Sequence, residues 1–123
     1  MYSEQELTID QEISQVKDGI AVLTEMAKKR KQFERLLENE DFKEIILEGF
    51  LKQYTLEQVS LLTNHEFQSP EKRATLQRTI EGTAVLGDYL DSYLMMSATV
   101  EQELEDAKKV LEELVQESQE QAE

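Results

Sequence analysis

The chain has 123 residues and carries 27 Asp and Glu against 13 Lys and Arg, which gives a formal net charge of −14. Four glycines and one proline are too few for β-sandwiches, barrels or dinucleotide-binding folds, which need turns at short intervals. The absence of cysteine excludes a disulfide framework, a zinc–thiolate site and a thiol nucleophile. These features predict a single helical domain over residues 1–123.

No segment of the sequence indicates contact with a membrane. The longest apolar runs, such as residues 45–47 and 94–96, cover only a few positions, whereas a helical span needs about 20. The first ten residues include Glu4, Glu6 and Asp10, and they lack the basic and apolar regions of a signal peptide. We therefore expect a soluble protein without membrane contact.

The first helix is expected over about residues 8–37. Its apolar residues are spaced alternately four and three apart, which is the pattern of a coiled-coil seam. The seam consists of Ile9, Ile13, Val16, Ile20, Leu23 and Ala27. Arg30 occupies the next seam position, and apolar character resumes at Phe33. The spacing predicts a helix that packs lengthwise against another helix through residues 9–27.

The second helix is expected over about residues 40–62. Asn39 is a favourable N-cap, and Glu40 and Asp41 place carboxylates at the positive end of the helix dipole. Apolar residues then recur at helical spacing: Phe42, Ile45, Ile46, Phe50, Tyr54, Val59 and Leu62. Thr55 followed by Gln58 resembles a capping box, which marks Thr55 as the place of an irregularity.

The third helix is expected over about residues 70–118, because Ser69 followed by Pro70 is a strong helix start after a loop at 64–69. The polar tail, residues 119–123, is expected to fray. The seam expected along this helix is Leu76, Ile80, Thr83, Gly87, Leu90, Leu94, Ser97, Glu101, Leu104, Lys108, Leu111 and Val115. A second apolar stripe lies beside the first: Leu86, Tyr89, Tyr93, Met96 and Val100.

Two arrangements of these helices fit the lengths of the segments. The first is a long, coiled-coil-like antiparallel hairpin that bends near Asn39, so that the 9–27 seam faces residues 97–115. The alternative is a three-helix up-down-up bundle, in which the chain also reverses at residues 38–41. The hairpin is favoured because the only long loop separates two arms of similar length.

A two-helix hairpin buries only one face of each helix, so aromatic residues in the middle of the chain stay partly exposed. Exposed apolar patches of this size usually mark contacts with other molecules. We therefore predict self-association, with a homo-oligomer interface formed by Phe42, Phe50, Tyr54, Leu86, Tyr89, Tyr93 and Met96.

No motif in the sequence supports catalysis, so we expect a protein that is not an enzyme and has no cofactor. The only histidine, His65, falls in the predicted loop, and Leu62 occupies the position that a Glu-x-x-His metal pair would need. Phosphate-loop, dinucleotide-binding and nucleophile-elbow motifs are all missing. We expect neither catalytic nor metal-binding residues.

The chain has one basic cluster, formed by Lys28, Lys29, Arg30, Lys31 and Arg35. It could bind nucleic acid or an acidic partner. The favoured interpretation is intramolecular pairing, with Glu25 on the same helix and with Glu101, Glu103 and Glu105 on the opposite arm. Direct nucleic-acid binding is not expected, because a net charge of −14 opposes approach to phosphates.

The C-terminal segment has the opposite character. Residues 101–123 hold nine acidic residues and two lysines. A helical surface of carboxylates can resemble a nucleic-acid backbone, which suggests an inhibitor of a nucleic-acid-binding enzyme that acts by DNA mimicry. The simpler interpretation is that the acidic residues keep a helical protein with an exposed seam soluble.

The outline Asn-x-x-Phe-Lys-x-x-Ile-x-x-Gly-Phe matches Asn39, Phe42, Lys43, Ile46, Gly49 and Phe50, and a proline-initiated second arm and an acidic closing helix follow it. This outline resembles small, mostly uncharacterised all-helical proteins of tailed bacteriophages. The resemblance implies a viral origin and a non-catalytic role, and some of the proteins it points to belong to the virion or its assembly. We then expect the protein in the virion or the host cytoplasm, in contact with itself and a larger viral structural protein; the alternative is the inhibitor described above.

Overall fold

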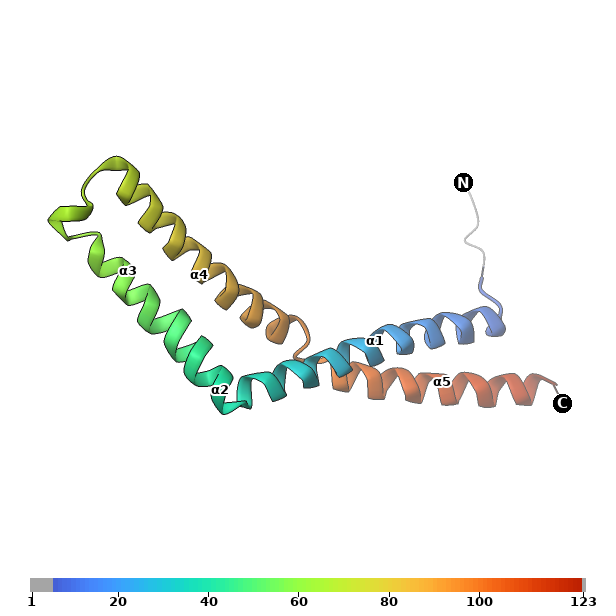
Figure 1. The fold of residues 1–123 in the computed structure, drawn as a ribbon. Helices are drawn as coiled ribbons and strands as arrows, with labels where there is room; N and C mark the ends of the chain where they lie inside the picture. Colours follow the sequence, from blue (N-terminus) through green and yellow to red (C-terminus); the bar gives the residue numbers. More distant parts are fainter. Residues whose placement is uncertain (1–5, 123) are drawn as a thin grey trace, which may run out of the picture. The chain divides into compact units, whose positions relative to one another are not determined.

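The computed structural model describes residues 6–122, and within that range it contains helices and short connections but no strand (Figure 1). The predicted all-α class is therefore confirmed. The chain separates into two compact units. Unit 1 comprises residues 1–29 and 97–123, of which 6–29 and 97–122 are described, and unit 2 comprises residues 30–96. Each unit contains its own packed apolar residues, and the single domain expected over residues 1–123 stays a prediction.

In unit 1 the first part of α1 (Ile9–Glu38) lies antiparallel to α5 (Val100–Ala122), as Figure 1 shows. Thr8 starts α1 with a reciprocal cap: its hydroxyl accepts from the Gln11 N–H at 3.1 Å, and its own N–H donates to the Gln11 side chain at 2.9 Å. The predicted seam is confirmed, because all its members are covered while most positions between them are exposed: Ile9, Ile13, Val16, Ile20 and Leu23 are half-buried and Ala27 is buried.

The helix expected over residues 70–118 is divided into α4 (Pro70–Met96) and α5, with a turn at residues 97–99. The turn occurs because Thr99 acts as the start of a new helix. Its carbonyl accepts from the Glu103 N–H at 3.0 Å, and its hydroxyl donates to the Glu103 carboxylate at 3.2 Å. Glu101 and Glu103 also favour the positive end of the new helix.

This break moves the seam of the last helix, so the predicted seam is partly wrong. Leu104 and Leu111 face inward as expected, but the positions of Glu101, Lys108 and Val115 are exposed. In each case the residue one position earlier lies inward instead: Val100, Ala107 and Leu114. The inward residues of this helix are therefore Val100, Leu104, Ala107, Leu111, Leu114 and Ser118. The helix continues to Ala122 over most of the tail that was expected to fray, and residue 123 lies outside the described residues.

Unit 2 contains a long helical arm that starts at Asn39 with a sharp change of chain direction (Figure 1). As predicted, the Asn39 side chain caps the helix by accepting from the Phe42 N–H at 3.0 Å. The arm consists of α2 (Glu40–Phe42), the π-helix η1 (Lys43–Tyr54) and α3 (Thr55–Leu61). The irregularity expected at Thr55 is therefore the boundary between the π-helix and α3.

The sequence explains why the arm widens. The inward residues Phe42, Leu47, Leu51 and Thr55 are separated by five, four and four positions, which exceeds the 3.6 residues per turn of an α-helix. The i→i+5 bonds of a π-helix widen each turn and bring these residues onto one face. Gly49 permits the geometry, because a Cβ atom added there would lie 3.0 Å from the Glu44 carbonyl oxygen.

The arm returns through a loop that contains the short 3₁₀-helix η2 (His65–Phe67) and then forms α4, which packs antiparallel to α3 (Figure 1). Ser69 starts α4 as predicted, with its carbonyl accepting from the Arg73 N–H at 3.0 Å. The Arg73 guanidinium reaches back and donates to the Leu62 carbonyl at 2.9 Å, which satisfies the C-terminal end of α3.

The core of unit 2 is small and partly aromatic. Phe33, Leu90 and Tyr93 are buried, and the rings of Phe33 and Tyr93 stack at a centroid distance of 4.6 Å. Half-buried residues pack around them: Leu37, Phe42, Leu47, Leu51, Leu86 and Leu94. Farther along α4, the buried hydroxyl of Thr83 accepts from Thr55 at 2.9 Å and donates to the Ile80 carbonyl at 2.7 Å. Both arms of unit 2 are therefore joined by apolar packing and by polar links, which include the Thr55–Thr83 and Arg73–Leu62 hydrogen bonds.

Candidate interaction surface

The seven residues predicted to form an interface do not share one environment. Tyr89, Met96 and Tyr54 are exposed, whereas the half-buried members are Phe42, Phe50 and Leu86. Tyr93 is only 8% exposed and belongs to the core of unit 2, so it is not available at the surface of a single copy. The error arises because Tyr89 and Tyr93 lie one turn apart, and the sequence does not show on which side of Tyr93 the end of α1 packs.

The most continuous exposed apolar surface lies along the outward face of α4. Gly82, Val85, Tyr89 and Met96 are spaced three, four and seven apart, which places them on one side of the helix. Val85 is 66%, Tyr89 53% and Met96 65% exposed. We call these four residues the α4 stripe. Sequence reasoning missed Val85, although its position four residues before Tyr89 would have identified it.

Tyr89 is the best fixed member of the α4 stripe. Its ring lies 5.7 Å from the ring of Phe33, tilted by 52°, and Phe33 in turn stacks on Tyr93. One edge of the Tyr89 ring is therefore supported by the core while the rest faces solvent. Gly82, two turns away, is not packed against other residues, because a Cβ atom added there would meet no atom within 4 Å. The stripe thus combines a supported aromatic ring with an open position.

Other exposed apolar residues of unit 2 are more scattered. On the other arm, Phe50 and Tyr54 stack at 5.8 Å, and Ile45 lies on the same side of η1. Leu56 is as exposed as Val85 but belongs to α3. An open hollow of about 300 Å³ lies between this arm and α4, with Leu51 and Ile80 among its apolar lining and Asp88 and Asp91 among its charged residues.

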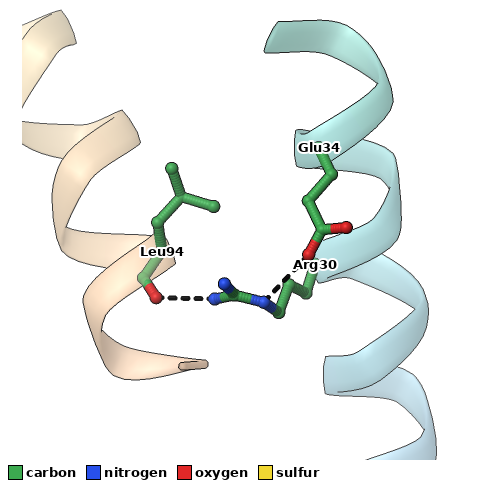
Figure 2. A network of polar contacts seen from close by, with 3 residues as sticks. All are labelled: Arg30, Glu34 and Leu94. Atoms are coloured by element: carbon green, nitrogen blue, oxygen red, sulfur yellow. Dashed lines mark hydrogen bonds and ion pairs between the residues drawn. The ribbon is translucent and has the colours of Figure 1, made fainter. Parts of the chain in front are cut away.

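The basic cluster is used partly inside unit 2, as Figure 2 shows. The Nε atom of Arg30 lies 3.0 Å from the Glu34 carboxylate, and its Nη1 atom donates to the Leu94 carbonyl at 2.7 Å. Leu94 belongs to the last turn of α4, so the guanidinium neutralises a carbonyl at the negative end of that helix. Arg30 therefore joins α1 to the C-terminal end of α4. Lys28, Lys29, Lys31 and Arg35 occupy exposed positions.

Neither the histidine nor the carboxylates form a recognisable chemical site in the described part of the chain. His65 is exposed in the loop. Within residues 6–122 no group of three or more His, Cys, Asp or Glu side chains is placed to hold a metal ion. In the same range no helix is both long and apolar enough to cross a bilayer. The exposed apolar surface of unit 2 is thus the main candidate site.

Charge is distributed unequally between the units. Unit 1 contains 15 Asp and Glu against 5 Lys and Arg, a net charge of −10. Unit 2 contains 12 Asp and Glu against 8 Lys and Arg, a net charge of −4. Most of the exposed large apolar residues belong to unit 2, which has the lower net charge.

No protein-family model, curated protein or solved structure matches the chain.

Proposed function

We propose that this chain is a non-catalytic helical protein that self-associates and acts through protein–protein contacts, as a structural or assembly component of a bacteriophage virion. The observation that carries the proposal is the exposed apolar surface of unit 2, where Val85 is 66%, Tyr89 53% and Met96 65% exposed.

The apolar composition of the exposed surface supports contacts with proteins. Nine of the large apolar residues that are exposed belong to unit 2 and four to unit 1. Their burial in a complex would be favourable by about 25 cal/mol for each Å² of apolar surface removed from water. Interfaces are enriched in tyrosine and methionine and depleted of charge at their centres, which is the composition of the α4 stripe.

The phage assignment rests on the resemblance of residues 39–50 to small phage proteins. In this chain Asn39 caps a helix, Phe42 packs on the core, and Gly49 lies within the π-helix. These three matched residues thus stabilise or permit the local backbone structure, which supports a structural role over a catalytic one. In this account the protein resides in the virion or the host cytoplasm and contacts a larger viral structural protein.

Light scattering of the purified chain at micromolar concentration tests the self-association. We expect a mass larger than that of one copy, increasing with concentration, and a single copy of 14.3 kDa at all concentrations would contradict the proposal. Affinity capture from infected host cells tests the assembly role. Capsid or tail proteins are the expected partners, and capture of a host polymerase or nuclease would instead support the second candidate.

The second candidate is an acidic inhibitor of a host nucleic-acid-binding enzyme that acts by DNA mimicry. The observation that favours it is the net charge of −10 on unit 1. Exposed carboxylates along α5 would carry the binding: Glu101, Glu103, Glu105, Glu112 and Glu113. Such binding must weaken steeply as salt is added, because it depends on long-range charge attraction. Partner binding that is unchanged in high salt would exclude this function.

A further inference from the structure

The hollow between the two arms of unit 2 combines an apolar lining with two carboxylates. It lies between the arm formed by η1 and α3 and the helix α4, and its volume is about 300 Å³. Leu51 and Ile80 belong to its apolar lining. Asp88 and Asp91 are its charged residues. Ligand pockets have volumes of roughly 300–1,000 Å³, so this hollow suits a single side chain better than a cofactor. We call it the α4 hollow.

The α4 hollow exists because α4 presents small residues to the other arm. Ala84 and Gly87 follow Ile80 at spacings of four and three, so the three residues lie on one side of the helix. A Cβ atom added at Gly87 would lie 3.9 Å from the Leu51 side chain, which is ordinary van der Waals contact. Packing inside the chain therefore does not require a glycine here, and the small residues leave space that the chain itself does not fill.

Asp88 and Asp91 line the α4 hollow without a compensating positive charge. They lie three positions apart on α4, so their side chains are neighbours, and like charges on neighbouring positions repel. Within residues 6–122 neither carboxylate takes part in an ion pair or in a hydrogen bond with another side chain. The sequence has no lysine or arginine between Arg78 and Lys108. A cation from another molecule would therefore be favourable at this place.

We propose that the α4 hollow takes a lysine side chain of a basic partner protein. The aliphatic stem packs against Leu51, Ile80 and Ala84. The ammonium group lies between Asp88 and Asp91. Lysine has a long apolar stem and a compact charge with three donors, so it can cover an apolar lining and bond to two carboxylates at once. The proposal rests on the protein–protein contacts proposed above and names the chemistry of one of them.

Charge selects a basic protein as the source of the lysine. Each copy of this chain carries a net charge of −14, so a second copy approaches the carboxylates against like charge, whereas a basic surface is attracted. A protein also covers more of the surface than a free amine does. Met95 lies four residues after Asp91, on the same side of α4, and is 79% exposed. A protein that places a lysine in the α4 hollow can cover Met95 as well.

Titration of the chain with N-acetyl-lysine amide, followed through its amide resonances by NMR, tests the site. N-acetyl-norleucine amide is the control ligand, because its side chain has a similar length and no charge. We expect the lysine compound to shift the resonances of Leu51, Ile80 and Gly87. The norleucine compound should bind about tenfold more weakly, because it lacks the charge-assisted bonds. Equal binding of the two compounds, shifts confined to other parts of the chain, or no shift at all would overturn the proposal.

Asp91→Asn tests the carboxylates. Asp91 is exposed, and asparagine has a helix propensity close to that of aspartate, so the variant should fold as the wild type does. Binding of N-acetyl-lysine amide should weaken about tenfold. Glu81→Gln is the matched control, because it removes the same charge from an exposed position of α4 outside the hollow. Equal weakening in the two variants would mean that only the net charge matters, and it would overturn the proposal.

Ala84→Leu tests the space for the stem. Leucine is a strong helix former and Ala84 is exposed, so the variant should remain helical, which circular dichroism checks. The new side chain occupies the place of the lysine stem, so binding of N-acetyl-lysine amide should weaken about tenfold or more. Ala74→Leu is the control, because Ala74 is also exposed on α4 but lies outside the hollow. Unchanged binding in Ala84→Leu would overturn the placement of the stem.

Three outcomes identify the source of the cation and separate this inference from the proposed function. If the diamine cadaverine binds tenfold more tightly than the lysine compound, the hollow takes a free amine and the assignment to a partner protein is wrong. If Asp91→Asn dissociates wild-type oligomers, the lysine belongs to a second copy and the assignment is also wrong. If the wild type self-associates but does not bind the lysine compound, this inference fails while the proposed function stands.

Discussion

The two units of the chain use helical pairing in different ways. Unit 1 joins α1 and α5 through a narrow seam of aliphatic residues and carries a net charge of −10. Unit 2 packs an aromatic core between segments that include a π-helix, and it carries a net charge of −4 with most of the exposed large apolar residues. The two properties are thus concentrated in different units: net negative charge in unit 1 and exposed large apolar residues in unit 2.

The largest expected effect is on the core of unit 2. Phe33→Ala removes the ring that stacks on Tyr93 and supports Tyr89, so the free energy of unfolding should decrease by about 3–5 kcal/mol. Val22→Ala on the same helix is the control, because Val22 is exposed in unit 1 and should change stability by less than about 0.5 kcal/mol. Urea denaturation followed by circular dichroism measures both. Similar losses for the two variants would show that unit 2 has no distinct core.

The next effect concerns the end of α4. Arg30→Met removes the hydrogen bond to the Leu94 carbonyl and the ion pair with Glu34, and it should destabilise unit 2 by about 1.5–3 kcal/mol. Lys31→Met removes a neighbouring charge at an exposed position and should have little effect. Hydrogen exchange of the last turn of α4 gives the local readout. Unchanged protection in Arg30→Met would contradict the capping role.

A smaller effect distinguishes the π-helix from the ordinary helices. Gly19→Ala in α1 should stabilise the chain by about 0.5–1 kcal/mol, because the new methyl group meets nothing and alanine favours the helix. Gly49→Ala should destabilise it by about 1 kcal/mol, because the methyl group would lie 3.0 Å from the Glu44 carbonyl oxygen. Thermal denaturation compares the two. A gain of stability in Gly49→Ala would mean that residues 43–54 form an ordinary α-helix.

The smallest expected effect is that of salt. Raising the salt concentration to about 1 M screens like charges, which should increase protection of the amides in α5 by a few-fold. The amides of α4 should change less, because unit 2 carries a net charge of only −4. Hydrogen exchange at two salt concentrations measures both helices in one sample. A larger response in α4 would contradict the unequal charge distribution as a source of repulsion.

Local signals in the sequence were sufficient for much of the fold. The caps at Asn39 and Ser69 accept hydrogen bonds from residues three and four positions later, so the nearby sequence identifies them. The seam in residues 9–27 was predictable because one helix that packs lengthwise on a single partner helix shows a regular repeat of apolar residues. The start of α5 at Thr99 was also visible in principle, since Glu101 and Glu103 follow it, but the apolar stripe through Met96 and Val100 obscured it.

Other features depend on contacts between distant residues and were not predictable in this way. The π-helix follows from inward spacings of five and four that become clear only when the partner, α4, is known. Tyr93 is buried because Phe33, sixty positions earlier, stacks on it. The same contact leaves Tyr89 at the edge of the core. Tyr89 and Tyr93 were both predicted to lie at the surface, whereas the structure places Tyr93 in the core and Tyr89 at the surface.

Sedimentation equilibrium of the wild type beside Val85→Glu and Leu56→Glu tests the central claim, that the exposed apolar face of unit 2 brings copies together. Val85 and Leu56 are both 66% exposed, so the two substitutions add the same charge at equally accessible positions on different helices. We predict oligomers for the wild type and for Leu56→Glu, and single copies for Val85→Glu over the micromolar range. A wild type that sediments as a single copy throughout that range would contradict the account.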